Sequence, residues 1–189
     1  MTPSVLSARL VVVTGPIAAG KSTVSELLTR RLLEEGLTVA CLDVDEVARM
    51  MHAPGGLTEV HWAQAHRAHG WLVAGWLDSP VDVVISHGSV STPWQTDALM
   101  SRVPAGTSVL RAQLLATFEA ALSRVVLDPE RGLSKDPTFL RRQYDRYANL
   151  TAMDPADLTF DTENETATEI VAVIAGRLLT PTPGYHLPS

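Results

Sequence analysis

The sequence predicts an α/β fold in which a doubly wound, five-stranded parallel sheet is flanked by helices. Short apolar runs alternate along the chain with segments of helical spacing, and the first run, residues 10–14, leads through a glycine-rich loop into a helix. Parallel neighbours need crossover connections, which helices supply. With 189 residues, the chain suits one domain with a substantial core. We expect that domain over residues 1–179 and a flexible, Pro-rich tail over 180–189.

The five predicted strands are short and largely apolar. Near-continuous apolar runs that end at turn residues are typical of strands buried on both faces of a parallel sheet. In chain order, the strands are expected at residues 10–14, 38–42, 81–86, 107–110 and 158–160.

The predicted helices begin and end at local signals. Gly36 follows the first helix, and Thr92-Pro93 and Asp136-Pro137 each place a capping side chain before a proline at the first helical position. Thr162-x-x-Glu165 reads as a capping box for the last helix. The helices are expected at residues 21–35, 46–51, 58–77, 93–102, 114–127, 137–150 and 162–179.

Residues 15–23 carry the strongest functional signal, because they fit the phosphate-binding pattern G-x-x-x-x-G-K-[ST]. Glycines let the backbone turn its N–H groups towards an anion, and the following helix adds its positive dipole end. Lys21 should reach the terminal phosphates, and the Ser22 hydroxyl suits Mg²⁺. The alternative is an ordinary glycine turn before a helix. The predicted nucleotide-binding residues are Gly15, Ala18, Ala19, Gly20, Lys21, Ser22 and Thr23.

Two aspartates follow the second strand, at the sheet edge that carries the phosphate loop. Phosphoryl transfer needs one group that holds Mg²⁺ and another that accepts or orients the proton of the attacking hydroxyl. Asp43 and Asp45 can divide these tasks. Alternatively, Asp45 only caps the next helix and Asp43 is a solvated strand end.

The third strand ends in Ser86-His87-Gly88, without the Asp that many nucleoside triphosphatases place there for Mg²⁺. This departure disfavours a motor, switch or general hydrolase and leaves Ser22 and Asp43 to hold the metal. His87 is a candidate to hydrogen-bond the substrate or to accept a proton, with a structural histidine as the alternative.

A cationic segment predicts a lid over about residues 125–140. Arginines on a mobile loop can exclude water and stabilise charge on the transferred phosphoryl group. The alternative is a solvated surface network with the neighbouring acids. The cations are Arg124, Arg131, Lys135, Arg141 and Arg142, of which Arg124 and Arg131 are the candidate catalytic residues.

Residues 46–80 are the predicted acceptor region, because they combine aromatic surface with hydrogen-bonding groups. A zinc site among His52, His61, His66 and His69 is the disfavoured alternative, since their spacing does not place three on one helical face and no cysteine completes the set. The candidate acceptor-binding residues are Asp45, Arg49, His52, Trp62, His66 and His87.

Composition narrows the function classes. A formal charge of −6 and a pI near 5.4 argue against a nucleic-acid partner. The sequence shows neither an apolar stretch of bilayer length nor a secretory signal, so we expect a cytoplasmic protein without a membrane partner. Cys41, the only cysteine, lies in an apolar run and is expected to be buried and inert. The oligomeric state stays open, with a homodimer as one alternative.

Over residues 9–179 the chain resembles the small P-loop kinases of the shikimate kinase, gluconate kinase and chloramphenicol phosphotransferase group. The phosphate loop, the Asp43-Val44-Asp45 doublet and the lid arginines Arg124 and Arg131 carry the resemblance. It implies a P-loop kinase fold in which Asp43 serves Mg²⁺ and Asp45 serves the acceptor hydroxyl. It also implies that the γ-phosphate of ATP is transferred to the alcohol of a small molecule.

The third strand departs from the shikimate kinase pattern, because the glycine triplet expected for shikimate recognition is not evident in Ser86-His87-Gly88. The aromatic acceptor region instead suits a bulky or apolar acceptor, such as a hydroxylated antibiotic. Two other functions stay open: a nucleotide kinase, whose acceptor site needs arginines for a second phosphate, and a non-catalytic nucleotide-binding module.

Overall fold

The computed structural model describes residues 6, 9–90, 92–128, 133–150 and 156–179. The predicted tail, residues 180–189, and the candidate lid residue Arg131 lie outside these ranges.

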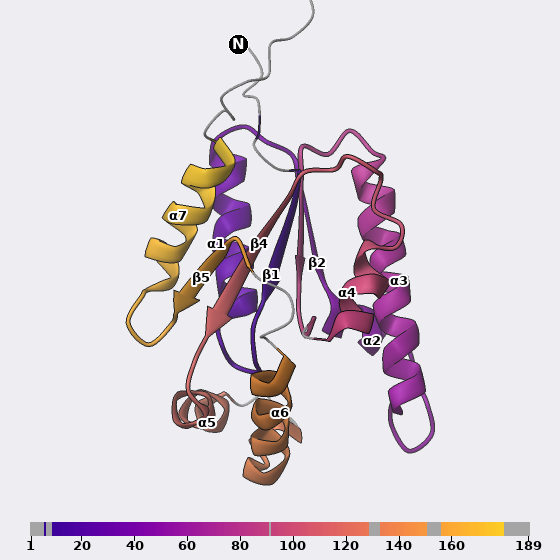
Figure 1. Cartoon of the computed structure of the whole chain (residues 1–189), viewed down its shortest axis with the longest axis vertical. Coiled ribbons are helices and arrows are strands. Elements are labelled where there is room, and N and C mark those ends of the chain that lie inside the picture. The colour runs from indigo at the N-terminus through magenta and orange to yellow at the C-terminus, as the bar shows by residue number, and fades with distance from the viewer. Residues whose placement is uncertain (1–5, 7–8, 91, 129–132, 151–155, 180–189) are drawn as a thin grey trace, which may run out of the picture.

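The described residues form a five-stranded sheet in which every pairing is parallel, with strand order β2-β3-β1-β4-β5. This arrangement confirms the predicted doubly wound fold. The chain adds β2 and β3 on one side of the central strand β1, and then β4 and β5 on the other side (Figure 1). The strands are β1 (Leu10–Thr14), β2 (Val39–Asp43), β3 (Val83–His87), β4 (Val109–Leu115) and β5 (Leu158–Asp161).

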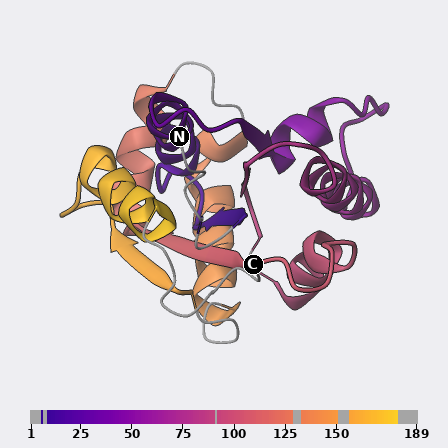
Figure 2. The ribbon, with the colours of Figure 1, turned by 90° about the horizontal axis from the view of Figure 1, so that it is seen from above.

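Helices cover both faces of the sheet. They are α1 (Lys21–Glu34), α2 (Val44–Arg49), α3 (Glu59–Leu77), α4 (Pro93–Met100), α5 (Phe118–Leu127), α6 (Pro137–Leu150) and α7 (Ala167–Leu179), with a 3₁₀ turn at Leu133–Lys135. Helices α1 and α7 lie on one face and α3 and α4 on the other (Figures 1 and 2).

Side-chain alternation along β1 explains the two cores. Val11 and Val13 pack with buried residues of α1 and α7, whereas Leu10 and Val12 pack with those of α3 and α4. All four side chains are buried, as the near-continuous apolar run predicts.

Helices α5 and α6 lie beyond the carboxyl ends of the strands, at the lower end of Figure 1. Their buried residues, Ala121, Val125 and Leu140, form a third cluster, which Ile17 and Ala18 of the phosphate loop join. The loop is therefore packed against this helix pair.

The predicted boundary between the fourth strand and the helix that follows it is wrong. β4 continues to Leu115 and α5 begins only at Phe118, so Leu114 and Leu115 belong to a strand rather than to a helix. Leu110, Ala112 and Leu114 are buried in alternation with more exposed neighbours, which is the period of a strand. The start of β5 and the helix preceding it are close to the predicted positions.

The capping box of the last helix lies one turn later than predicted. Glu169 accepts hydrogen bonds from the backbone N–H and hydroxyl of Thr166, and Thr166 accepts one from the Glu169 N–H, so Thr166-x-x-Glu169 starts α7. Glu165 instead accepts from the N–H of Asp161.

Cys41 is exposed rather than buried. β2 is an edge strand, so its side chains are covered less than those of β1 or β3, and an apolar run alone does not distinguish edge from centre.

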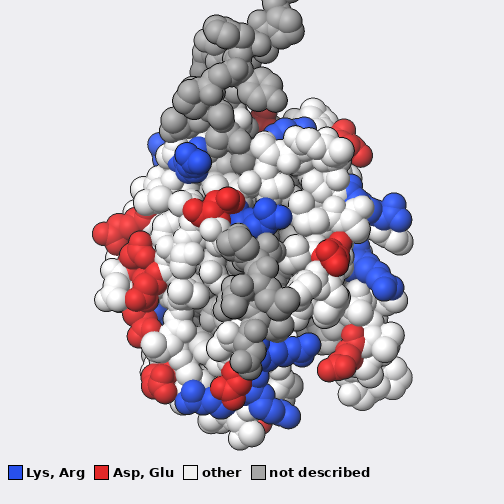
Figure 3. All heavy atoms as spheres, viewed as in Figure 1, with Lys and Arg blue, Asp and Glu red and all other residues white. Residues whose placement is uncertain are grey.

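None of the helices in the described part of the chain combines the length and the hydropathy that a bilayer crossing needs. On the face shown in Figure 3, Lys and Arg side chains are interspersed with Asp and Glu side chains.

Candidate active site

The connection between β1 and α1 has the backbone geometry of an anion-binding loop. Gly15 has φ 150°, and a Cβ there would lie 2.5 Å from the carbonyl oxygen of Leu114, so only glycine fits. Gly20 is the N-cap of α1 and makes no side-chain capping bond. The first N–H groups of α1 are therefore left for an anionic ligand.

Lys21 folds back over this loop. Its Nζ donates hydrogen bonds to the carbonyl oxygens of Gly15 and Pro16, at 2.9 and 2.7 Å. Ser22 and Thr23 follow it in the first turn of α1 and are exposed. The predicted nucleotide-binding residues thus occupy one loop and one helix start, and their binding role stays a prediction.

Asp43 ends β2, and its Oδ1 accepts a hydrogen bond of 2.9 Å from the N–H of Asp45. Asp43 is therefore the N-cap of α2, whereas the alternative considered from sequence gave that task to Asp45. Asp45 lies in the first turn of α2. Ser22 and Asp43 offer a hydroxyl and a carboxylate, the oxygen ligands that suit Mg²⁺.

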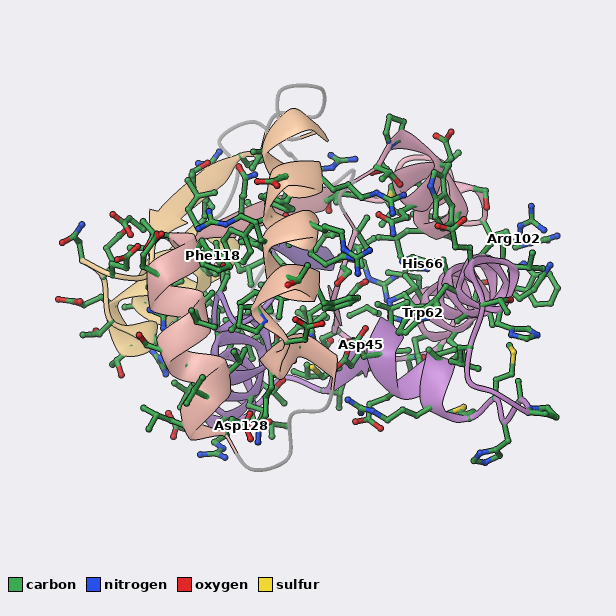
Figure 4. All side chains as sticks on the ribbon, turned by 90° about the horizontal axis from the view of Figure 1, so that it is seen from below. Asp45, Trp62, His66, Arg102, Phe118 and Asp128 are labelled. Carbon is green, nitrogen blue, oxygen red and sulfur yellow. The ribbon has the colours of Figure 1, made fainter. Side chains whose placement is uncertain are left out.

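Burial raises the pKa of Asp45, and the negative charge of Asp43 raises it further. Lys21, Arg49 and His87 oppose this shift. Asp45 is consequently a stronger proton acceptor than an exposed carboxylate. It lies at the start of α2, at the carboxyl edge of the sheet, on the side towards α6 in Figure 4.

His87 is the last residue of β3 and lies opposite Asp43 in the register of β2 and β3. Its Nδ1 is 3.9 Å from Asp43 Oδ2, too far for a hydrogen bond, and has no partner among the described residues. Burial lowers the pKa of His87, while Asp43 opposes the shift. The structure thus brings Asp43, Asp45 and His87 together at adjacent strand ends.

Gly88 follows His87 and allows the start of α2 to approach the backbone closely. A Cβ at this position would lie 2.3 Å from Cγ1 of Val44 and 3.3 Å from Oδ1 of Asp43. The turn after β3 therefore packs directly on the start of α2, which fixes the two strand ends relative to each other.

Two of the predicted acceptor-binding residues are buried or half-buried beside this turn. His66 places Nδ1 2.9 Å from the carbonyl oxygen of Trp62 and Nε2 3.0 Å from that of Ser89. Its ring also meets Trp94 edge to face, with centroids 5.1 Å apart. In Figure 4, Trp62 and His66 lie on the side of α3 that faces Asp45, whereas Arg102 lies on the outer side of the molecule.

The other two candidates lie at the surface. Arg49 is exposed and forms an ion pair with Glu46, and His52 is exposed in the segment after α2. No recorded hydrogen bond joins Arg49 or His52 to Asp45. Their role in acceptor binding therefore stays a prediction.

The remaining histidines of α3 have structural partners. His61 Nδ1 accepts from the N–H of Thr58 in a capping box, and His69 Nε2 lies 2.8 Å from Ser86 Oγ in the core. Among the described residues, no three His, Cys, Asp or Glu side chains are grouped so that they could hold a metal ion.

Arg124 lies in the last turn of α5, and its guanidinium is held by three hydrogen bonds. It donates to the carbonyl oxygen of Ala18, and to both the hydroxyl and the carbonyl oxygen of Thr162, at 2.8 to 3.0 Å. The second lid candidate, Arg131, is outside the described residues. The lid itself stays a prediction.

Tyr144 is a site residue that the sequence did not indicate. It lies on α6, and its hydroxyl donates a hydrogen bond of 2.9 Å to the carbonyl oxygen of Ile17 in the phosphate loop. Burial raises its pKa well above the ordinary value of a tyrosine, so the hydroxyl keeps its proton. No local pattern relates residues 127 positions apart, which is why the pairing was missed.

Residues 7–114 match the sequence model of the adenylylsulphate kinase family. The match spans more than half of the chain and includes the phosphate loop, both aspartates and His87, and it ends before α5 and α6. A search of curated protein sequences finds no match.

Solved structures share the fold. They include shikimate kinase from Bacteroides thetaiotaomicron, with 18% identity, a TM-score of 0.65, and coverage of 88% of this chain and 96% of that one. The Mycobacterium tuberculosis APS kinase in complex with AMPPNP and APS has 18% identity, a TM-score of 0.63, and coverage of 89% and 96%. A gluconokinase from Sinorhizobium meliloti 1021 has 18% identity, a TM-score of 0.62, and coverage of 88% and 90%. At these identities the likeness establishes the fold.

Proposed function

The chain belongs to the adenylylsulphate kinase family, and from this premise we propose that it is an ATP- and Mg²⁺-dependent kinase that phosphorylates a hydroxyl group of a small molecule. One observation carries the proposal. An anion-binding loop at an uncapped helix start and the Asp43, Asp45 and His87 side chains share the carboxyl edge of one parallel sheet. In open α/β sheets, ligands bind at this edge.

The loop and Lys21 bind the polyphosphate of ATP. Backbone N–H groups at the start of α1 and the lysine charge would contact its oxygens, and Lys21 would exchange its bonds to the loop carbonyls for bonds to phosphate. Ser22 and Asp43 would hold Mg²⁺, which when bound neutralises charge on the terminal phosphates.

Asp45 accepts the proton of the acceptor hydroxyl as that oxygen bonds to the γ-phosphorus and the bond from phosphorus to ADP breaks. Its raised pKa favours this role. His87 ends the neighbouring strand and is the second candidate, either to hydrogen-bond the acceptor or to accept the proton.

The acceptor is the open part of the proposal. The family name makes adenylylsulphate the first compound to test, since it carries ribose hydroxyls. The ring of Trp94 against His66, with Trp62 one turn earlier on the same helix as His66, supports a bulky acceptor with an apolar face, which includes hydroxylated antibiotics.

Transfer from labelled ATP to a panel of alcohols tests this function. The panel contains adenylylsulphate, shikimate, gluconate and hydroxylated antibiotics, and the expected result is Mg²⁺-dependent labelling of one acceptor class. Release of free phosphate without transfer to any compound would count against a kinase with an alcohol acceptor.

Lys21→Ala should reduce kcat/KM by about 10²- to 10³-fold, because it removes a charge that the transition state needs. Arg30→Ala is the matched control. Arg30 is a cation on the same helix whose side chain is 70% exposed and whose ion pair with Glu26 lies at the surface. Equal activity of the two variants would remove the proposed mechanism.

A further inference from the structure

Four consecutive carbonyl oxygens of the phosphate loop accept hydrogen bonds from side chains. Two of them are bound by the loop's own lysine, and the other two by residues that follow the loop by more than 100 positions. The bonds run from Lys21 Nζ to Gly15 and Pro16, from the Tyr144 hydroxyl to Ile17, and from the Arg124 guanidinium to Ala18. When a nucleotide draws Lys21 away, the side-chain bonds from α5 and α6 to Ile17 and Ala18 remain.

These two bonds fix the directions of peptide groups. In a trans peptide, the C=O group and the next N–H group point in opposite directions within one plane, and the described chain contains no cis peptide bond. Holding the carbonyl of Ile17 therefore fixes the direction of the N–H of Ala18. Holding the carbonyl of Ala18 fixes that of Ala19, which in this structure donates a hydrogen bond of 3.3 Å to the carbonyl oxygen of Pro16. The loop binds anions through such N–H groups, so their direction determines its affinity.

Ala18 is where the loop needs support. Its φ of 60° is the only positive value of a non-glycine residue in the described part of the chain. This conformation is unfavourable for a residue with a Cβ and persists only where surrounding contacts hold it. Arg124 binds the carbonyl oxygen of Ala18, and the methyl group of Ala18 packs into the cluster of α5 and α6.

Arg124 and Tyr144 are themselves held in place. The guanidinium of Arg124 also binds both oxygens of Thr162, so both of its terminal nitrogens are engaged. The ring of Tyr144 meets the ring of Phe118 edge to face, with centroids 5.9 Å apart. Phe118 is the first residue of α5 and lies at the end of that helix next to α6 in Figure 4. Neither side chain is free to swing away from the loop.

We propose that Arg124 and Tyr144 form a clasp that holds the phosphate loop in its anion-binding conformation. Both are positioning residues, and Arg124 acts through the loop backbone rather than on the transferred phosphoryl group, unlike the lid role predicted from sequence. This inference rests on the proposed function, because it concerns how the same site binds a triphosphate.

Calorimetric binding of MgATP and of inorganic tripolyphosphate to Tyr144→Phe tests the clasp. The substitution keeps the ring and removes only the hydroxyl. We expect Kd to rise about three- to tenfold for both ligands, which corresponds to the loss of one ordinary hydrogen bond. In transfer assays, KM for ATP should rise while kcat at saturating ATP changes less than about twofold.

Tyr147→Phe is the matched control. Tyr147 lies on the same helix, and its hydroxyl accepts a hydrogen bond of 2.9 Å from the side-chain amide of Gln113. It also bonds to the side chain of Thr14 at the end of β1, and no recorded bond joins it to a carbonyl oxygen of the loop. In urea unfolding, Tyr147→Phe should lose about as much stability as Tyr144→Phe. Its Kd values for MgATP and tripolyphosphate should equal those of the wild type. Arg124→Lys is the second test: one ammonium group cannot reproduce the bonds to Ala18 and Thr162, so Kd should again rise for both ligands.

Each contrary outcome has a defined meaning. Wild-type affinity in Tyr144→Phe, or an equal loss in Tyr147→Phe, would overturn the clasp while the proposed function stands. A lower kcat with unchanged Kd in Arg124→Lys would place Arg124 on the transition state and also overturn it. If the wild-type chain binds neither MgATP nor tripolyphosphate, the proposed function itself fails, and the clasp fails with it.

Discussion

At the scale of single residues, neighbouring groups of the same chemistry have different surroundings. Asp43 caps α2 with one oxygen, whereas Asp45, two positions later, is half-buried beside that charge and has a raised pKa. Burial and a like charge act in the same direction on a carboxylate. The pair can therefore divide metal binding and proton acceptance although both residues are aspartates.

Asp45→Asn should lower kcat by about 10²- to 10⁴-fold and leave the Kd of MgATP within about twofold, because the amide keeps the shape and cannot accept the proton. Steady-state transfer and calorimetry measure the two quantities. Glu46→Gln is the control. It neutralises the carboxylate that follows Asp45 in α2 and is exposed, so kcat should stay at the wild-type value. If kcat of Asp45→Asn is within tenfold of the wild-type value, His87 is the proton acceptor instead. The large decrease in kcat should then be found in His87→Asn.

At the scale of elements, close backbone contact joins α3 to α4. A Cβ on Gly70 would lie 2.3 Å from the carbonyl oxygen of Ala98, whereas a Cβ on Gly75, on the exposed side of the same helix, would meet no atom within 4 Å. Both glycines read alike in the sequence, as breaks in a helical pattern. Only the neighbouring helix distinguishes them.

Gly70→Ala should lower the free energy of unfolding by about 1 to 3 kcal/mol, because α4 must move to admit the methyl group. Gly75→Ala should raise it by about 0.5 to 1 kcal/mol, because alanine is the better helix former. Urea unfolding of both variants at one pH measures the difference. Equal values for the two substitutions would contradict the packing described for α3 and α4.

At the scale of the whole molecule, the stability of the fold should depend on pH through a buried histidine. The pKa of His69 is lowered from its ordinary 6.5 to about 4. Burial is the main cause, the neighbouring His66 and His87 act in the same direction, and the charge of Asp43 opposes the shift. The side chain is 1% exposed and bonds to Ser86 of β3. Unfolding frees this imidazole to take up a proton.

As the pH falls below 6.5, the unfolded chain binds a proton at His69 that the folded chain does not bind until about pH 4. The contribution of His69 is thus complete above pH 6.5 and lost between pH 6.5 and 4, with a change on the order of 3 kcal/mol. Unfolding free energies of wild type and His69→Gln, measured across this range, should converge towards low pH. Parallel pH profiles would show that His69 does not titrate differently in the two states.

Local signals in the sequence were sufficient for much of the fold. The apolar run at Leu10–Thr14, the Thr92-Pro93 cap of α4 and the glycine-rich loop each depend on residues close in the chain, and each appears where it was predicted. The capping box of α7 was predicted at the wrong place for the same reason, because two consecutive Thr-x-x-Glu patterns satisfy the same local rule. The parallel sheet followed from the alternation of elements, since helices must connect parallel strands.

The sequence by itself determined the parallel α/β fold, the phosphate loop and the pair of aspartates, because periodicity and motif spacing are properties of neighbouring residues. The tertiary structure alone decided that Cys41 is exposed, that Arg124 binds the loop and that Tyr144 supports Ile17. Those outcomes depend on which strand is at the edge and on which helix packs against the loop. Such contacts join residues far apart in the chain, and their geometry exists only once the whole core has formed.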